Sequence, residues 1–88
     1  MHPVESVNIS SVLVNARPDL IRQAQDGLAL LAGVEVHAVT DDGRLIVTIE
    51  ADSDQAVADM FAVINRLPGV LSASMVYHQF ESNPDEEL

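Results

Sequence analysis

The three histidines are the side chains of this 88-residue sequence best suited to bind a metal or to transfer a proton. His2, His37 and His78 lie far apart and show no His-x-x-x-His or similar ligand spacing. Cysteine is absent, which excludes disulfides, iron–sulfur clusters, thiolate zinc sites and a thiol nucleophile. We therefore expect no metal site and no bound cofactor.

Hydroxyl chemistry is also weakly supported. Four serines in strand-like segments have neither a nucleophile elbow nor a histidine or acid at a motif spacing, namely Ser10, Ser11, Ser72 and Ser74. The segment "NARPDL" contains Arg17 but no glycine, so it lacks the anion cradle that acyl-phosphate chemistry would need. The sequence thus predicts a protein that is not an enzyme.

The charge balance favours cationic partners. Four basic residues stand against fourteen acidic ones, giving a net charge of −10. Such a chain repels phosphate backbones and anionic lipids and attracts cations over a long range, so no nucleic acid is expected. The opening "MHPVESVNIS" has no basic n-region, and the apolar stretch "GLALLAGVEV" is too short to span a bilayer. We expect a soluble, cytoplasmic protein without membrane insertion.

The first half of the chain predicts a strand, a helix and a second strand. Residues 7–14 are rich in β-branched side chains, which favours a strand. Pro18 and Asp19 favour the start of a helix. The apolar stripe of this helix ends before Gly33 and consists of Leu20, Ile21, Ala24, Leu28 and Leu31. Residues 34–39 then alternate as in a half-buried strand.

The second half repeats this pattern after a tight turn. The segment "TDDGR" is a strong hairpin signal, and residues 45–50 alternate as the partner strand. Asp52 and Gln55 match a capping box. The stripe of the second helix consists of Val57, Met60, Phe61, Ile64 and Leu67. Residues 70–78 form the fourth predicted strand.

The order βαββαβ predicts a ferredoxin-like α+β fold, with a four-stranded antiparallel sheet and two helices on one face. "LAGV" and "LPGV" occupy the same place in each half, so Gly33 and Gly69 are expected to be left-handed helix caps. We expect residues 1–81 to form one domain. The acidic segment 82–88, interrupted by Pro84, is expected to be a disordered tail.

The second face of this sheet is left open, and strand alternation predicts its side chains. Strand by strand they are Ile9, Ser11 and Leu13, then Glu35, His37 and Val39, then Ile46, Thr48 and Glu50, and finally Val76 and His78. Ala38, Met75 and Tyr77 are expected to face the helices. The first strand is apolar on both sides, so Val12 and Val14 are the alternative choice there. An apolar centre with carboxylates around it is typical of an interaction site.

Other uses of this architecture lack their sequence marks. Metal carriers use a Cys-x-x-Cys motif, and RNA-recognition domains display aromatic residues on a basic surface. A small-molecule-binding regulatory domain, acting as a dimer, shares the topology and the helix–glycine–strand junction. This alternative stays open on the residues alone.

Three segments resemble the NapD family of maturation chaperones. They are "ISSVLVNAR", "LAGVEVHAVTDDGRLIVTIEADS" and "LPGVLSASMVYHQFE", and the likeness covers residues 7–81. The closing strand is its most specific part. The resemblance implies a cytoplasmic protein that binds the twin-arginine signal peptide of NapA, the catalytic subunit of the periplasmic nitrate reductase. It also implies that export of that precursor is delayed until cofactor insertion is complete.

The resemblance further implies a helical signal peptide lying on the open sheet face. Glu35 and Glu50 are suited to pair with the arginines, while Ile9, Leu13 and Ile46 are suited to its apolar turns. The remaining predicted contacts are Ser11, His37, Thr48, Val76 and His78. The chain is expected to be a monomer or a weak dimer, because the two edge strands could stay unpaired or pair with a second copy.

Overall fold

The computed structural model describes the backbone of residues 7–81 and the side chains of residues 8–76. The elements follow one another as β1 (Val7–Ala16), the short 3-10 turn η1 (Pro18–Leu20), α1 (Ile21–Ala29), β2 (Val34–Val39), β3 (Arg44–Ala51), α2 (Asp54–Asn65) and β4 (Val70–Glu81). The predicted tail, residues 82–88, lies outside the described residues.

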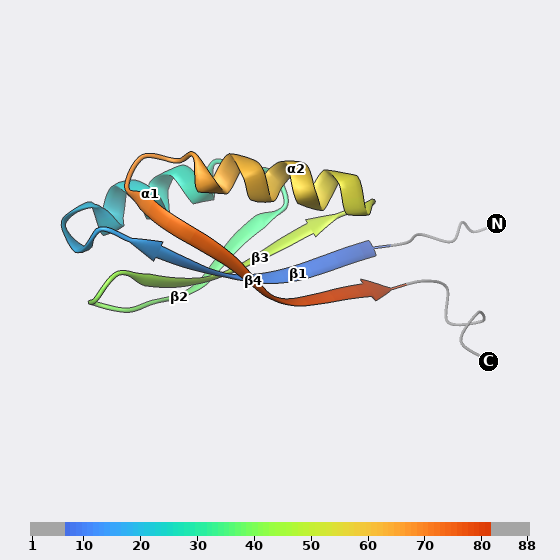
Figure 1. Ribbon diagram of the computed structural model, residues 1–88, viewed down its shortest axis with the longest axis horizontal. Helices are drawn as coiled ribbons and strands as arrows, with labels where there is room; N and C mark the ends of the chain where they lie inside the picture. Colours follow the sequence, from blue (N-terminus) through green and yellow to red (C-terminus); the bar gives the residue numbers. More distant parts are fainter. Residues whose placement is uncertain (1–6, 82–88) are drawn as a thin grey trace.

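The four strands form one sheet in the order β2-β3-β1-β4. Every neighbouring pair is antiparallel, with β1 and β3 at the centre and β2 and β4 at the edges. Both helices lie on the same face of this sheet (Figure 1). The predicted ferredoxin-like fold is therefore confirmed.

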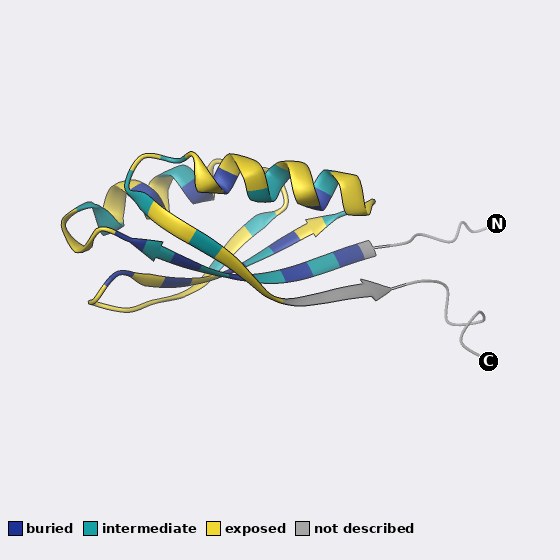
Figure 2. Cartoon of the chain, viewed as in Figure 1, coloured by how far each residue is buried: buried dark blue, intermediate teal, exposed yellow. Residues whose placement is uncertain are grey.

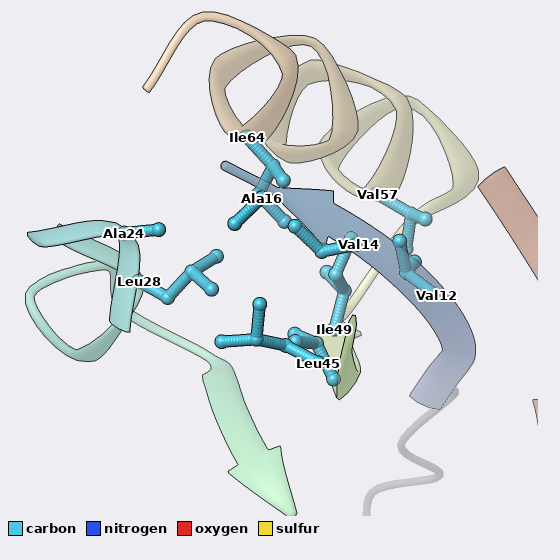
Figure 3. Packing of buried hydrophobic residues seen from close by; sticks show 10 residues of the cluster. Val12, Val14, Ala16, Ala24, Leu28, Leu45, Ile49, Val57 and Ile64 are labelled. Atoms are coloured by element: carbon cyan, nitrogen blue, oxygen red, sulfur yellow. The ribbon is translucent and has the colours of Figure 1, made fainter. Parts of the chain in front are cut away.

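The core lies between the sheet and the two helices. Its buried apolar side chains come from both central strands and from the helix faces turned toward them (Figure 3), namely Val12, Val14, Ala16, Ala24, Leu28, Leu45, Val47, Ile49, Val57 and Ile64. Full burial of a Val, Leu or Ile side chain contributes about 1.5–3 kcal/mol. The apolar stripes predicted for the two helices are confirmed, because every member packs in or against this cluster apart from Leu20 and Ile21, which lie half-buried at the start of α1. No helix in the described part of the chain is long and apolar enough to cross a membrane.

The burial pattern of β1 shows which of its side chains lie on each face of the sheet. From residue 8 to residue 16, its residues alternate between buried and half-buried (Figure 2). Val12 and Val14 are fully buried and stand opposite Val47 and Leu45 of β3. Ile9, Ser11 and Leu13 therefore lie on the open face, as predicted, and the alternative choice for this strand is wrong.

The helix α2 begins one residue later than the predicted capping box implies. Ser53 is its N-cap, and its hydroxyl oxygen accepts a hydrogen bond from Ala56 N–H (3.0 Å). Gln55 instead donates from Nε2 to Asp59 Oδ1 (2.9 Å) one turn along the helix. The box of Asp52 and Gln55 is thus wrong, because Ser53 has the extended backbone and the reach to satisfy the free N–H.

The two glycines of the repeated junction lie in turns rather than at helix caps. Val34 N–H donates to Leu31 O (3.3 Å), and Val70 N–H donates to Leu67 O (3.1 Å). Within these turns Gly33 has φ +78° and Gly69 has φ +89°, while no other residue type in the described chain has a positive φ. This is the pattern of a type II turn, which needs glycine at its third position. The left-handed backbone of both glycines was predicted correctly, but their position at helix caps was not.

A bulge interrupts β2 and corrects the predicted alternation. Val36 stands opposite Val47, but the next pair is Ala38 with Ile46, so His37 is an extra residue. An inserted residue reverses the alternation beyond it. Ala38 therefore lies on the open face and Val39 on the helix side, the opposite of the prediction.

The edge strand β4 has a register shift of the same kind. Met75 stands opposite Val12, on the helix side as predicted, although it is 41% exposed. The next pair is Tyr77 with Ser11, so Val76 is the extra residue. The predicted faces of Tyr77 and His78 assumed unbroken alternation, and the side chains of both lie outside the described residues.

Candidate functional site: the open sheet face

The open face carries side chains from all four strands, and no described element covers it. We define it by the register as Ile9, Ser11, Leu13 and Asn15 of β1, Arg44, Ile46, Thr48 and Glu50 of β3, Glu35, His37 and Ala38 of β2, and Ser72 and Ser74 of β4. Cross-strand neighbours on one face interact directly. The register therefore also determines which side chains of the open face are adjacent and could contact one partner at the same time.

An apolar row crosses the middle of the open face. Leu13 stands opposite Ile46 of β3, and Ile46 stands opposite Ala38 of β2. Ile46 is 41% exposed although its side chain is large and apolar. Ile9 adds an apolar side chain four residues away along β1, separated from Leu13 on this face by Ser11. Such a surface is stabilised when a partner covers it.

Two carboxylates lie to one side of this row, toward the end of β3 that carries Glu50. Glu50 stands directly opposite Ile9, and Glu35 stands opposite Thr48. Because Thr48 and Glu50 share a face of β3, the two glutamates are diagonal neighbours, a relationship that typically separates positions by about 7–8 Å. Both are exposed, and neither forms an ion pair with a described residue. Their charges are therefore available to a cationic partner.

The bulge in β2 places His37 beside these carboxylates. Its Nε2 lies 2.8 Å from Thr48 Oγ1, within hydrogen-bonding distance. The bond joins the edge strand to the centre of the open face. It therefore fixes the position of the imidazole next to Glu35.

The opposite end of the open face is more nearly neutral. Arg44 stands opposite Asn15, whose Nδ2 donates to Ser72 Oγ (3.3 Å). In the hairpin loop, the hydroxyl of Thr40 donates to a carboxylate oxygen of Asp42. This hydrogen bond, with the charge of Arg44, lowers the pKa of Asp42 below its usual range. The Arg44 Nε to Asp42 Oδ2 distance is 3.9 Å, a loose ion pair.

The structure brings most of the predicted site residues onto one face. Those that share it are Ile9, Ser11, Leu13, Glu35, His37, Ile46, Thr48 and Glu50. Val76 is 59% exposed but lies at the register shift, and the side chain of His78 is outside the described residues. The binding role of each remains a prediction.

Sequence reasoning missed five residues of the open face. Extending the alternation by one step in the first and third strands would have found Asn15 and Arg44. Counting back in steps of two from Val76 along the last strand would have found Ser74 and Ser72. Ala38 had no sequence signal, because its place depends on the bulge at His37.

The fold defines a small ferredoxin-like α+β protein with an uncovered sheet face. Among the described residues, no group of three or more His, Cys, Asp or Glu side chains is placed to hold a metal ion. The family model described as "NapD protein" matches residues 7–82, and the chain therefore belongs to the NapD family.

Comparison with individual proteins agrees with this assignment. The chain is 34% identical over 80 residues to Chaperone NapD of Escherichia coli strain K12, covering 89% of this chain and 91% of the relative. It is 34% identical over 73 residues to Chaperone NapD of Paracoccus pantotrophus, covering 83% of this chain and 64% of that one.

A solved structure shares the fold. The solution structure of the Escherichia coli Tat proofreading chaperone protein NapD matches with a TM-score of 0.77 and 30% identity, covering 85% of this chain and 80% of that one. The predicted family resemblance is confirmed. The chain is a chaperone and not an enzyme.

Proposed function

We propose that this chaperone binds the twin-arginine signal peptide of NapA, the catalytic subunit of the periplasmic nitrate reductase. It acts in the cytoplasm and delays export of the precursor until cofactor insertion is complete. The observation that carries the proposal is the open face, where exposed Ile46 and half-buried Ile9 and Leu13 adjoin two carboxylates without a described ionic partner. Family membership supports the chaperone role and does not favour a small-molecule-binding regulatory domain.

The arginines of the peptide are the group that this face suits best. A guanidinium can donate two parallel hydrogen bonds to one carboxylate, and Glu35 and Glu50 offer one carboxylate for each arginine. The net charge of −10 attracts a cationic segment before contact is made. Exposed ion pairs are individually weak, so charge alone would give loose and salt-sensitive binding.

The apolar part of the peptide would supply the rest of the binding free energy. An amphipathic helix presents apolar side chains at i, i+3, i+4 and i+7, which can cover Ile9, Leu13 and Ile46. This apolar surface is small, and the backbone of a helical peptide forms no hydrogen bonds with the strands of the sheet. Binding is therefore reversible, as a hand-over to an export machinery requires.

Calorimetric titration of the full chain with a twin-arginine peptide tests the proposal. The matched ligand is the same peptide with both arginines changed to alanine, and each is measured at low and at moderate salt. We expect the arginine peptide to bind more tightly and to weaken as salt rises. Equal affinity for the two peptides, or indifference to salt, would show that charge pairing does not drive binding.

A second pair of titrations locates the binding surface. The variant Glu35→Gln/Glu50→Gln removes both carboxylate charges from the open face. The control Asp26→Asn removes one charge from the exposed side of α1. Weakening in the first variant with little change in the second is the expected result, and equal weakening in both would place the site elsewhere.

A further inference from the structure

The charges of the open face are separated along β3. Glu50 lies at one end of this strand and Arg44 at the other, with Ile46 between them. At about 3.3 Å per residue, the six steps from Arg44 to Glu50 span about 20 Å. The face therefore has an acidic end, an apolar middle and a more nearly neutral end that presents the guanidinium of Arg44.

The guanidinium of Arg44 keeps most of its hydrogen-bonding capacity. Arg44 has a side chain that is 62% exposed, and its single described carboxylate neighbour, Asp42, is 3.9 Å from Nε. Asp42 is also bound by the hydroxyl of Thr40 in the hairpin loop. A guanidinium has five donors, so Arg44 can still donate to an acceptor on the open face.

A helical guest matches this separation in length and in electrical polarity. About 20 Å corresponds to about 13 residues at a rise of 1.5 Å per residue. A helix carries a partial positive charge at its N-terminus and a partial negative charge at its C-terminus, where carbonyl oxygens lack partners. The positive N-terminus of the guest helix can be placed next to the carboxylates of Glu35 and Glu50. The free carbonyl oxygens at its C-terminus can then accept hydrogen bonds from Arg44.

We infer that the guest helix lies in one direction on the open face, with its cationic N-terminus at Glu35 and Glu50 and its C-terminal end at Arg44. The inference rests on the proposed function and adds the direction and length of the bound segment. Arg44 is then a specificity-determining residue, because it favours an acceptor about 13 residues after the start of the guest helix.

Spin labels on the peptide test the direction. The chain contains no cysteine, so a nitroxide attached through a cysteine at either end of the peptide marks the guest alone. We expect an N-terminal label to broaden the amide resonances of Ile9 and Glu50. A C-terminal label should broaden those of Asn15 and Arg44. An interchanged pattern, or equal broadening at both ends by each label, overturns the single direction while leaving the proposed function intact.

Failure of the proposed function looks different in this experiment. If the peptide shifts no resonance of the open face, the proposed binding surface itself is wrong, and the direction falls with it. If the amide resonances of the open face shift but the two labels broaden the wrong residues, only the inferred direction of the peptide is refuted. The two failures are therefore distinguishable in one set of spectra.

A charge-matched pair of variants tests the role of Arg44. Arg44→Glu and Arg22→Glu change the net charge equally, but Arg22 lies on the exposed side of α1, away from the open face. We expect Arg44→Glu to weaken the peptide severalfold, with a larger loss for a free C-terminal carboxylate than for its amide. Arg22→Glu should leave the affinity unchanged or slightly higher. Equal effects of the two variants would overturn the assignment of Arg44.

Discussion

The carbonyl oxygen of Gly33 accepts a hydrogen bond from the backbone N–H of Glu50 (2.8 Å). The turn that follows α1 is thereby joined to the strand residue whose side chain stands at the acidic end of the open face. This backbone hydrogen bond links the turn after α1 to the acidic end of the open face.

Gly33→Ala is expected to destabilise the protein by about 1–3 kcal/mol, the cost of a left-handed backbone at a non-glycine residue. An added Cβ would also meet the carbonyl oxygen of Glu50. Chemical denaturation gives the free energy of unfolding, and titration of the same variant should show weaker peptide binding because Glu50 is displaced.

Gly27→Ala is the matched control for this substitution. Gly27 lies within α1, and an added Cβ would be 3.5 Å from Leu67 Cδ2, an ordinary van der Waals contact. Alanine favours a helix interior over glycine by about 1 kcal/mol, so this variant should be as stable as the parent or more so. Equal destabilisation by both changes would refute the role given to the Gly33 turn.

Glu50→Lys is expected to weaken the twin-arginine peptide while changing the free energy of unfolding by no more than about 1 kcal/mol, as for a surface substitution. The carboxylate is exposed and has no described ionic partner, so stability should not depend on it. Asp26→Lys makes the same change of charge on α1 and should have a smaller effect. A large loss of stability in Glu50→Lys would instead assign Glu50 a structural role.

Ser53→Ala is expected to destabilise the protein by about 1 kcal/mol, because it removes the hydroxyl that caps α2. Asp52→Ala should cost less, since Asp52 precedes the N-cap and makes no described cap bond. Thermal and chemical denaturation of the two variants side by side measure the difference. The reverse order would support the capping box that the sequence suggests.

Thr40→Val is expected to return the pKa of Asp42 toward its usual value of 3.8. The hydroxyl of Thr40 is the largest cause of the lowering, and the charge of Arg44 adds to it. A lowered pKa in the folded state means stabilisation that is present above 3.8 and lost as the pH falls through the folded value. Carboxyl carbon shifts followed by NMR during acid titration check this, and an unchanged Asp42 midpoint in the variant would contradict it.

Strand alternation predicted the open face where the register runs without interruption. β1 and β3 pair continuously from Asn8 with Ala51 to Asn15 with Arg44, so period-two reasoning gave the correct face for both strands. It failed in β2 after His37, because the bulge there depends on how the edge strand meets β3 and leaves no mark in local composition.

The cap and turn errors have a related cause. Asp52 and Ser53 are adjacent and both can cap a helix, so backbone direction decides between them. The glycine at position 33 indicated a residue with left-handed backbone, but helix caps and type II turns both use such a residue.

The charge pattern of the open face was predictable only in part, because Arg44 lies just outside the predicted third strand.

The register shifts at His37 and Val76 lie in the two edge strands, β2 and β4. Each interrupts the regular spacing of backbone donors and acceptors along an outer edge, so an incoming extended segment finds no long run of partners. A helical segment has no such need, because its backbone hydrogen bonds are already made within itself. We therefore expect the irregular edges to disfavour an extended guest, and to oppose edge-to-edge aggregation while the face of the sheet stays uncovered.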